Sequence, residues 1–178
     1  MTPGSGRSTT LASLAVSLLA SGTRLVVLTP RDSPLRALEA HPGVQLLASR
    51  APTEAEFAAA VGAGSGPRVV LVDDADLLPL PGIDQDLRAL VGSGRERGIG
   101  VAAAATGDTM AGARGWLSAL KRQRKGVLLD PQSLMEGDVL GVRLTHAQLR
   151  NRRPGRGLTV DPRSGELISV QIPQTDLG

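Results

Sequence analysis

The stretch best suited to chemistry is a glycine-rich segment near the start of the chain, with the order Gly-Ser-Gly-Arg-Ser-Thr. This order follows the end of the pattern G-x-x-x-x-G-K-[ST]. In that pattern glycines free backbone N–H groups to wrap around phosphate oxygens, and the last hydroxyl holds Mg²⁺. We therefore predict a phosphate-binding loop in which Ser8 also ligates Mg²⁺. The expected phosphate contacts are Gly4, Ser5, Gly6, Arg7, Ser8 and Thr9.

Two residues depart from that pattern. Met1 stands where the first glycine belongs, and Arg7 replaces the lysine. Lysine is a compact charge that reaches the β- and γ-phosphates, whereas arginine is a larger planar fork. Arg7, also a candidate catalytic residue, is therefore compatible with phosphate binding and unfavourable for fast hydrolysis. A buried strand normally precedes such a loop, and this first strand is expected to be missing from the chain.

A second constellation of polar residues follows an apolar run. Val69–Val72 is succeeded directly by Asp73 and Asp74. In phosphate-loop enzymes the first acid at such a strand end holds Mg²⁺ through water, and the next one polarises the attacking water. We therefore predict Asp73 as a Mg²⁺ residue and Asp74 as the candidate base. The alternative is that the two aspartates only solvate the strand end or cap the next helix.

Other candidate residues are less specific. Thr106 ends a predicted strand and could sense the γ-phosphate, or it could simply begin a helix. Arg95, Arg97 and Arg114 are candidates for an arginine finger that acts across a subunit boundary. Two basic clusters, 121–125 and 150–156, either contact the phosphate backbone of DNA or form a solvated surface.

Elements that could position these residues alternate along the chain. Leu11, Leu14, Ala15, Leu18 and Leu19 recur at helical spacing after the loop. Further helices are expected at Ser33–Ala40, Glu54–Val61, Ile83–Arg97 and Thr109–Arg124. Strands are expected at Leu25–Leu28, Val44–Leu47, Arg68–Asp73, Ile99–Thr106 and, as a short central-type strand, Val127–Leu129. This order predicts an α/β three-layer sandwich with a mostly parallel sheet. A C-terminal hairpin is expected from Gly157–Val160 and Leu167–Ile172.

Composition narrows the range of functions. The 178 residues predict one domain with a sizeable core. Cysteine is absent and the two histidines lie far apart, which argues against thiolate or histidine metal sites. One phenylalanine and one tryptophan leave little for stacking on single-stranded nucleic acid. No membrane span is expected, because polar residues interrupt the apolar stretch 11–28.

Taken together, these segments resemble the FtsK/SpoIIIE family of P-loop motor ATPases over nearly the whole chain. The matching pieces are Gly4–Thr9, Val69–Asp74, Gly94–Val101 leading to Ala105 and Thr106, Gly126–Ser133 with Gly137–Gly141, and Pro154–Leu158 with Val170–Pro173. The ending is most like a C-terminal, degenerate ATPase domain of the type VII secretion motors EccC and EssC. Arg7 and Asp74 fit such an eroded copy.

The resemblance implies a RecA-like domain spanning 1–178, truncated at its N-terminus within the loop. It implies weak binding of ATP and Mg²⁺, slow or absent hydrolysis, and a motor ring of subunits or neighbouring ATPase domains, hexameric in the family. It further implies a secreted protein as substrate and a cytoplasmic location, tethered to the membrane through other parts of the full protein. The alternatives are a DNA translocase domain of the FtsK/SpoIIIE type and a substrate-binding pseudo-ATPase module without nucleotide.

Overall fold

The computed structural model describes residues 6–29, 33–47, 49, 51–78, 80–150 and 153–175. Its centre is a four-stranded parallel sheet with the order β2-β1-β3-β4. The strands are β1 (Arg24–Leu28), β2 (Val44–Leu47), β3 (Arg68–Val72) and β4 (Ile99–Ala103). The parallel α/β fold predicted from the alternating pattern is confirmed.

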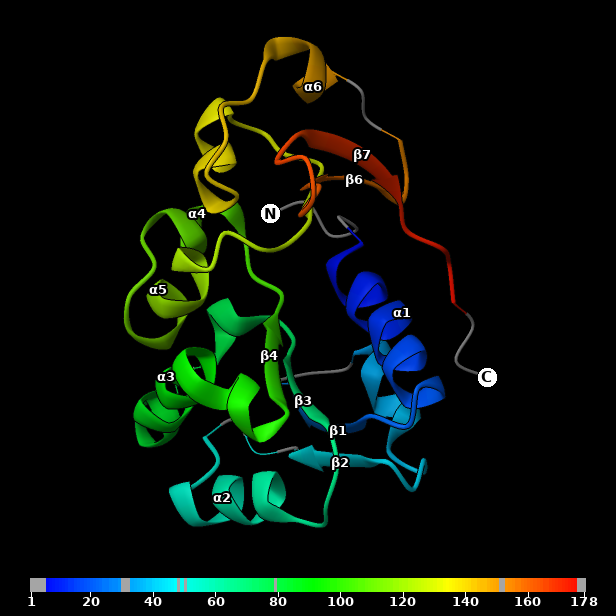
Figure 1. Cartoon of the computed structure of the whole chain (residues 1–178), viewed down its shortest axis with the longest axis vertical. Coiled ribbons are helices and arrows are strands. Elements are labelled where there is room, and N and C mark those ends of the chain that lie inside the picture. Colours follow the sequence, from blue (N-terminus) through cyan, green and yellow to red (C-terminus); the bar gives the residue numbers. More distant parts are fainter. Residues whose placement is uncertain are drawn as a thin grey trace.

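Helices cover both faces of this sheet, which makes three layers (Figure 1). One face carries α1 (Arg7–Ala20) and the 3₁₀ turn η1 (Pro34–Leu38). The other face carries α2 (Glu54–Gly62), α3 (Asp84–Ser93) and α5 (Gly115–Arg122). Successive strand residues point to opposite faces, so Val70 and Val72 join one core whereas Leu71 joins the other.

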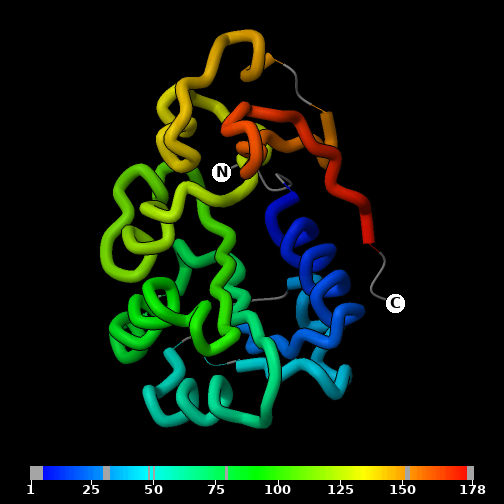
Figure 2. Tube along the Cα trace, viewed as in Figure 1, coloured from blue at the N-terminus to red at the C-terminus, as the bar shows by residue number. Residues whose placement is uncertain are grey.

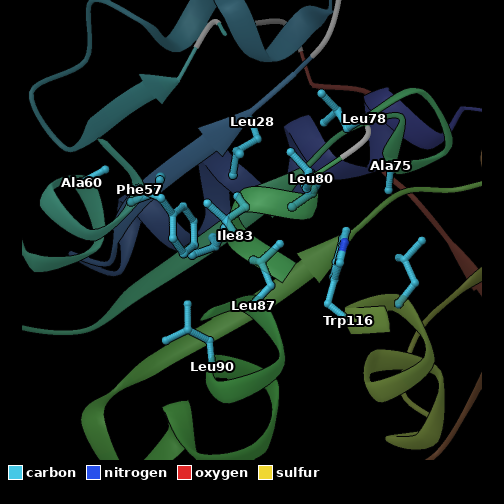
Figure 3. Close-up of a cluster of buried hydrophobic side chains, with 14 of the residues drawn as sticks. Leu28, Phe57, Ala60, Ala75, Leu78, Leu80, Ile83, Leu87, Leu90 and Trp116 are labelled. Atoms are coloured by element: carbon cyan, nitrogen blue, oxygen red, sulfur yellow. The ribbon is translucent and has the colours of Figure 1, made fainter. Parts of the chain in front are cut away.

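The larger core lies under α2, α3 and α5. Phe57 from α2, Leu87 from α3 and Trp116 from α5 converge on the sheet (Figure 3), each at most 5% exposed. Burying such large apolar side chains stabilises the fold by roughly 1.5–3 kcal/mol each. The start of α2 is fixed by a capping box between Thr53 and Glu56, as the sequence predicts.

A second, antiparallel sheet has the order β5-β6-β7. It consists of β5 (Leu128–Leu129), β6 (Arg156–Val160) and β7 (Leu167–Gln171). The predicted C-terminal hairpin is thereby confirmed. The prediction of Val127–Leu129 as a central-type strand is wrong: β5 has two residues and lies at the edge of this second sheet. The Cα trace shows the hairpin lying beyond the N-terminal end of α1 (Figure 2).

Between β5 and β6 the chain forms η5 (Leu134–Val139) and α6 (His146–Arg150). These elements surround a small apolar cluster of Leu128, Leu140 and Leu144.

Several predicted boundaries differ from the structure because glycine breaks the elements. The helix expected over Thr109–Arg124 splits into α4 (Gly107–Ala111) and α5. Gly112 follows α4, and Gly115 begins α5 with a positive φ of 58°. A Cβ on Gly115 would also clash with the Asp84 carboxylate.

The remaining elements are short. The long helix expected to Arg97 ends as the 3₁₀ turn η4 (Gly94–Arg97) after α3. The turns η2 (Ala75–Leu77) and η3 (Pro81–Ile83) connect β3 to α3. None of the helices in the described segments is long and apolar enough to cross a lipid bilayer.

Candidate functional site

The candidate site lies at the carboxyl ends of the parallel strands. Leu28, Val72 and Ala103 are register partners at the last positions of β1, β3 and β4. The chain leaves all three strands on the same edge of the sheet, which is where open α/β sheets bind ligands. Asp73 follows β3 directly, and the first turn of α1 supplies Ser8 to the same place.

The start of α1 has the backbone geometry of an anion site. Gly6 adopts the left-handed conformation, with φ 75° and ψ 13°, and α1 has neither a side-chain cap nor an acidic residue in its first turn. The Thr10 N–H and hydroxyl both donate to the Gly6 carbonyl, at 2.8 Å each. The first N–H groups of a helix have no intrahelical acceptor, and the helix dipole adds positive potential there. Of the predicted loop, Gly4 and Ser5 lie outside the described residues.

The Asp73 side chain is fully enclosed, with no exposed surface. The Ser8 hydroxyl donates to its Oδ1 at 3.1 Å, and the Asp74 N–H donates to the same oxygen at 3.0 Å. The Ser33 hydroxyl donates to Oδ2 at 2.6 Å. The structure therefore brings together Ser8 and Asp73, the two residues predicted to hold Mg²⁺.

Ser33 is a residue that the motif patterns do not identify. A serine before a proline is a common helix start, and Ser33 indeed caps η1. This signal predicts the cap and gives no indication of a partner at position 73.

Asp74 faces the loop arginine. One guanidinium nitrogen of Arg7 lies 3.8 Å from Asp74 Oδ1, with 26% of the Arg7 side chain and 9% of the Asp74 side chain exposed. Asp74 has a left-handed backbone, with φ 45° and ψ 52°. It occupies the N-cap position of η2 without making a side-chain cap hydrogen bond. The candidate base and the candidate phosphate cation are thus paired with each other.

Thr106 begins a helix. Its side chain accepts a hydrogen bond from the Thr109 N–H at 3.2 Å and donates to the Thr109 hydroxyl at 2.9 Å. These contacts account for Thr106 as the cap of α4, and its role as a phosphate sensor stays a prediction. Arg95 and Arg97 lie in η4, which leads into the opposite, amino end of β4. An arginine-finger role for them would therefore require the site of another chain.

A cleft of about 800 Å³ opens beside the start of α1. Gly6, Thr9 and Thr10 line one side, and residues of the antiparallel sheet and its connections, such as Leu129 and Arg156, line the other. Its size lies within the range of small-molecule sites. Continuity with the first turn of α1 would let a ligand place an anionic group at the helix and its remaining part in the cleft.

The donor set suits Mg²⁺ better than a transition metal. No group of three or more Asp, Glu, His or Cys side chains that could enclose a metal occurs within the described ranges. Mg²⁺ commonly uses one or two protein oxygens together with water and substrate phosphates. Ser8 and Asp73 are an oxygen-only pair of that kind, so they fit a cation that arrives with a phosphate ligand.

Comparisons with known proteins identify the fold. No family model matches the sequence, and no curated protein matches it. EssC (ATPases 2 and 3) from Geobacillus thermodenitrificans superposes with a TM-score of 0.72 at 17% identity, over 98% of this chain and 36% of that one. The cytoplasmic domain of EssC gives 0.71 at 16% identity, over 99% of this chain and 39% of that one.

A third solved structure contains a bound peptide. Thermomonospora curvata EccC (ATPases 2 and 3), in complex with a signal sequence peptide, gives a TM-score of 0.59 at 17% identity, over 86% of this chain and 31% of that one. At these identities the likeness shows the fold alone. The chain thus has the RecA-like fold of the EssC and EccC ATPase domains, as the motif resemblance implied, and spans between a third and two fifths of the two EssC chains.

Proposed function

We propose that this chain is an ATP-binding domain of a type VII secretion translocase of the EccC/EssC kind, with weak nucleotide affinity and slow or absent hydrolysis. The observation that carries the proposal is the joining of three features at one sheet edge. These are the uncapped start of α1, the Ser8–Asp73 hydrogen bond and the adjoining cleft, in a fold shared with EssC and EccC ATPase domains.

In this proposal the loop residues hold the phosphates. The backbone of Gly4, Ser5 and Gly6 and the first N–H groups of α1 donate to phosphate oxygens, and Arg7 adds a positive charge. Ser8 and Asp73 hold Mg²⁺, Ser8 directly and Asp73 through water. When bound, the cation neutralises charge on the β- and γ-phosphates. The base or sugar occupies the cleft beside Thr9 and Thr10.

The Arg7–Asp74 pair supports slow hydrolysis. The Arg7 guanidinium has two possible partners, the Asp74 carboxylate and the phosphate. While it pairs with Asp74, it is less available to the phosphate. If Arg7 turns to phosphate, the Asp74 carboxylate is left facing added negative charge. Asp74 is also one methylene shorter than the usual glutamate, and catalysis is sensitive to placement errors of about 1 Å.

Calorimetric titration with ATP and Mg²⁺, together with phosphate release, tests the proposal. We expect saturable binding that weakens in Arg7→Ala. Any phosphate release should disappear in Asp74→Asn while binding persists. Absence of ATP binding to the wild-type protein would contradict the nucleotide-binding function. Equal release by the wild type and Asp74→Asn would remove Asp74 as the base.

A second candidate is a substrate-binding module in which nucleotide plays no part. It is favoured by the exposed Met135, with 71% of its surface accessible, and by the signal peptide bound to the EccC structure. Under this candidate a secreted protein's signal segment would bind with the same affinity to the wild type and to Arg7→Ala. An affinity that follows Arg7 would instead couple the two ligands.

Assembly and location are part of the proposal. The EssC and EccC structures of ATPases 2 and 3 each contain more than one ATPase, and another EssC structure is a cytoplasmic domain. We place this domain in the cytoplasm beside neighbouring ATPase domains or subunits, in a ring tethered to the membrane through other parts of the full protein. The DNA translocase alternative remains a prediction without support from these structures.

A further inference from the structure

Ser33 reaches the buried carboxylate of Asp73 from a different element than the loop does. Its hydroxyl donates to Asp73 Oδ2 at 2.6 Å, a shorter hydrogen bond than the 3.1 Å bond from the Ser8 hydroxyl to Oδ1. The Ser33 hydroxyl oxygen also accepts from the Leu35 N–H at 3.3 Å, and Ser33 thereby caps η1. A hydroxyl can donate one hydrogen bond, and the Ser33 hydroxyl donates it to Asp73.

The position of Ser33 is fixed by packing. Leu35 has no exposed surface and Leu38 is 8% exposed, and both belong to the core beneath α1. The hydroxyl is therefore held between an anchored 3₁₀ turn and the strand-end acid. Asp73 has no exposed surface, so bulk solvent does not compete with Ser33 for Oδ2.

We infer that Ser33 is a positioning residue for the cation site: it fixes the rotation of the Asp73 carboxylate so that Oδ1 stays directed at Ser8. This inference rests on the proposed function. The terminal torsion of aspartate is broad, and Ser8 and the Asp74 N–H both act on Oδ1. Ser33 alone, among the contacts given above, holds the other oxygen.

The expected consequence is specific to the cation. Removing the hydrogen-bond partner of a direct metal ligand typically changes metal affinity 10–100-fold. Ser33 acts one step further out, because it contacts Asp73, which holds Mg²⁺ through water. In Ser33→Ala we therefore expect the Mg²⁺-dependent part of ATP affinity to fall by about 10-fold, the lower end of that range. The affinity measured in excess EDTA should stay within about twofold of the wild type, because phosphate binding at the start of α1 uses backbone N–H groups that Ser33 does not supply.

Ser133 provides a matched control. Ser133 caps η5 by accepting from the Met135 N–H, and its backbone angles, φ −134° and ψ 145°, nearly equal the −133° and 147° of Ser33. Ser133→Ala removes an equivalent cap outside the Ser8–Asp73 site. Both variants should lower the thermal midpoint of the ligand-free protein, and only Ser33→Ala should lower the Mg²⁺ dependence.

The experiment is calorimetry with ATP, in Mg²⁺ and in EDTA, on the wild type and both serine variants. Ser33→Thr, which keeps the hydroxyl, should retain the Mg²⁺ dependence, and Ser33→Val, its near-isostere, should lose it. This pair decides the question if Ser33→Ala does not fold. Equal Mg²⁺ dependence in the wild type and Ser33→Val would overturn the inference and leave the proposed function intact. A wild type that binds no ATP under either condition would overturn both.

Discussion

Two adjacent aspartates show how strongly position decides the role of a residue. Asp73 is fully buried and accepts three hydrogen bonds, whereas Asp74 turns into the left-handed region and faces Arg7. The paired acids and the glycine loop could be found in the sequence because both belong to one pattern. Ser33 could not, since its contact with Asp73 joins residues 40 positions apart that no shared pattern links.

The backbone of Asp74 gives a first prediction. Non-glycine residues pay about 1–2 kcal/mol in the left-handed region, and asparagine and aspartate tolerate it best. Asp74→Asn and Asp74→Ala both remove the charge, and only the latter removes a side chain suited to φ 45°. We expect Asp74→Ala to be less stable than Asp74→Asn by about 1 kcal/mol in urea unfolding. Equal midpoints for the two variants would contradict this account.

Arg7 gives the second prediction. A lysine at this position would present a compact charge to the β- and γ-phosphates in place of the planar guanidinium that lies 3.8 Å from Asp74 Oδ1. Arg7→Lys should therefore bind ATP–Mg²⁺ several-fold more tightly than the wild type in calorimetry. Arg88→Lys, at the exposed i,i+4 pair with Asp84, is the control and should leave the affinity unchanged. Weaker binding by Arg7→Lys would indicate that the arginine is itself the preferred phosphate contact.

At the scale of elements, the sequence predicts best where a local signal ends or begins a helix. The capping residues of α2 and the apolar run of β3 act within their own segments, so both were predictable. The split between α4 and α5 occurs at Gly112 and Gly115, and the Asp84 carboxylate, which lies beside Gly115 and accepts from the Trp116 N–H, is a distant contact that no local pattern predicts. β5 was placed in the wrong sheet because two apolar residues look alike in a central and an edge strand.

The capping box of α2 gives the third prediction. Hydrogen bonds from the Thr53 backbone and then its side chain lower the pKa of Glu56 below its ordinary value of 4.5. A lowered pKa means that this stabilisation is present above 4.5 and is lost as pH falls through the folded-state value. Thr53→Ala should cost about 1 kcal/mol at neutral pH in urea unfolding.

The loss of stability caused by Thr53→Ala should be smaller in acid. Protonated Glu56 no longer accepts a hydrogen bond as a carboxylate from the Thr53 hydroxyl, so the wild type has lost that contribution too. Glu54→Gln is the control, because Glu54 also lies in the first turn but outside the box. A Thr53→Ala cost that is independent of pH would show that the bond from the Thr53 hydroxyl to the Glu56 carboxylate contributes nothing; the bond from the Thr53 N–H to Glu56 remains in that variant.

At the scale of the whole molecule, the two sheets are connected through the C-terminal tail. After β7 the chain runs back along α1 (Figure 1), and Ser13 on that helix is only 7% exposed. The Ser13 hydroxyl donates to the Pro173 carbonyl at 2.8 Å and accepts from the Thr175 hydroxyl at 2.8 Å. The hairpin was predictable from its turn residues, whereas a return contact over 160 positions was not.

The tail contact gives the last prediction. Pro173 and Gln174 line the cleft, so a tail held on α1 also fixes one wall of the proposed nucleotide site. Ser13→Ala leaves the Pro173 carbonyl without this donor and should cost about 1 kcal/mol. Amide exchange at Ile172, whose N–H donates to the Gly155 carbonyl next to the released tail, should quicken while the core strands keep their protection, since opening of the tail is local. Ser17→Ala, on the same helix, removes only a hydroxyl bonded to the Ser13 carbonyl and should leave the tail unchanged. If both variants exchange alike, the tail is held by other contacts, and α1 and the second sheet are not coupled through Ser13.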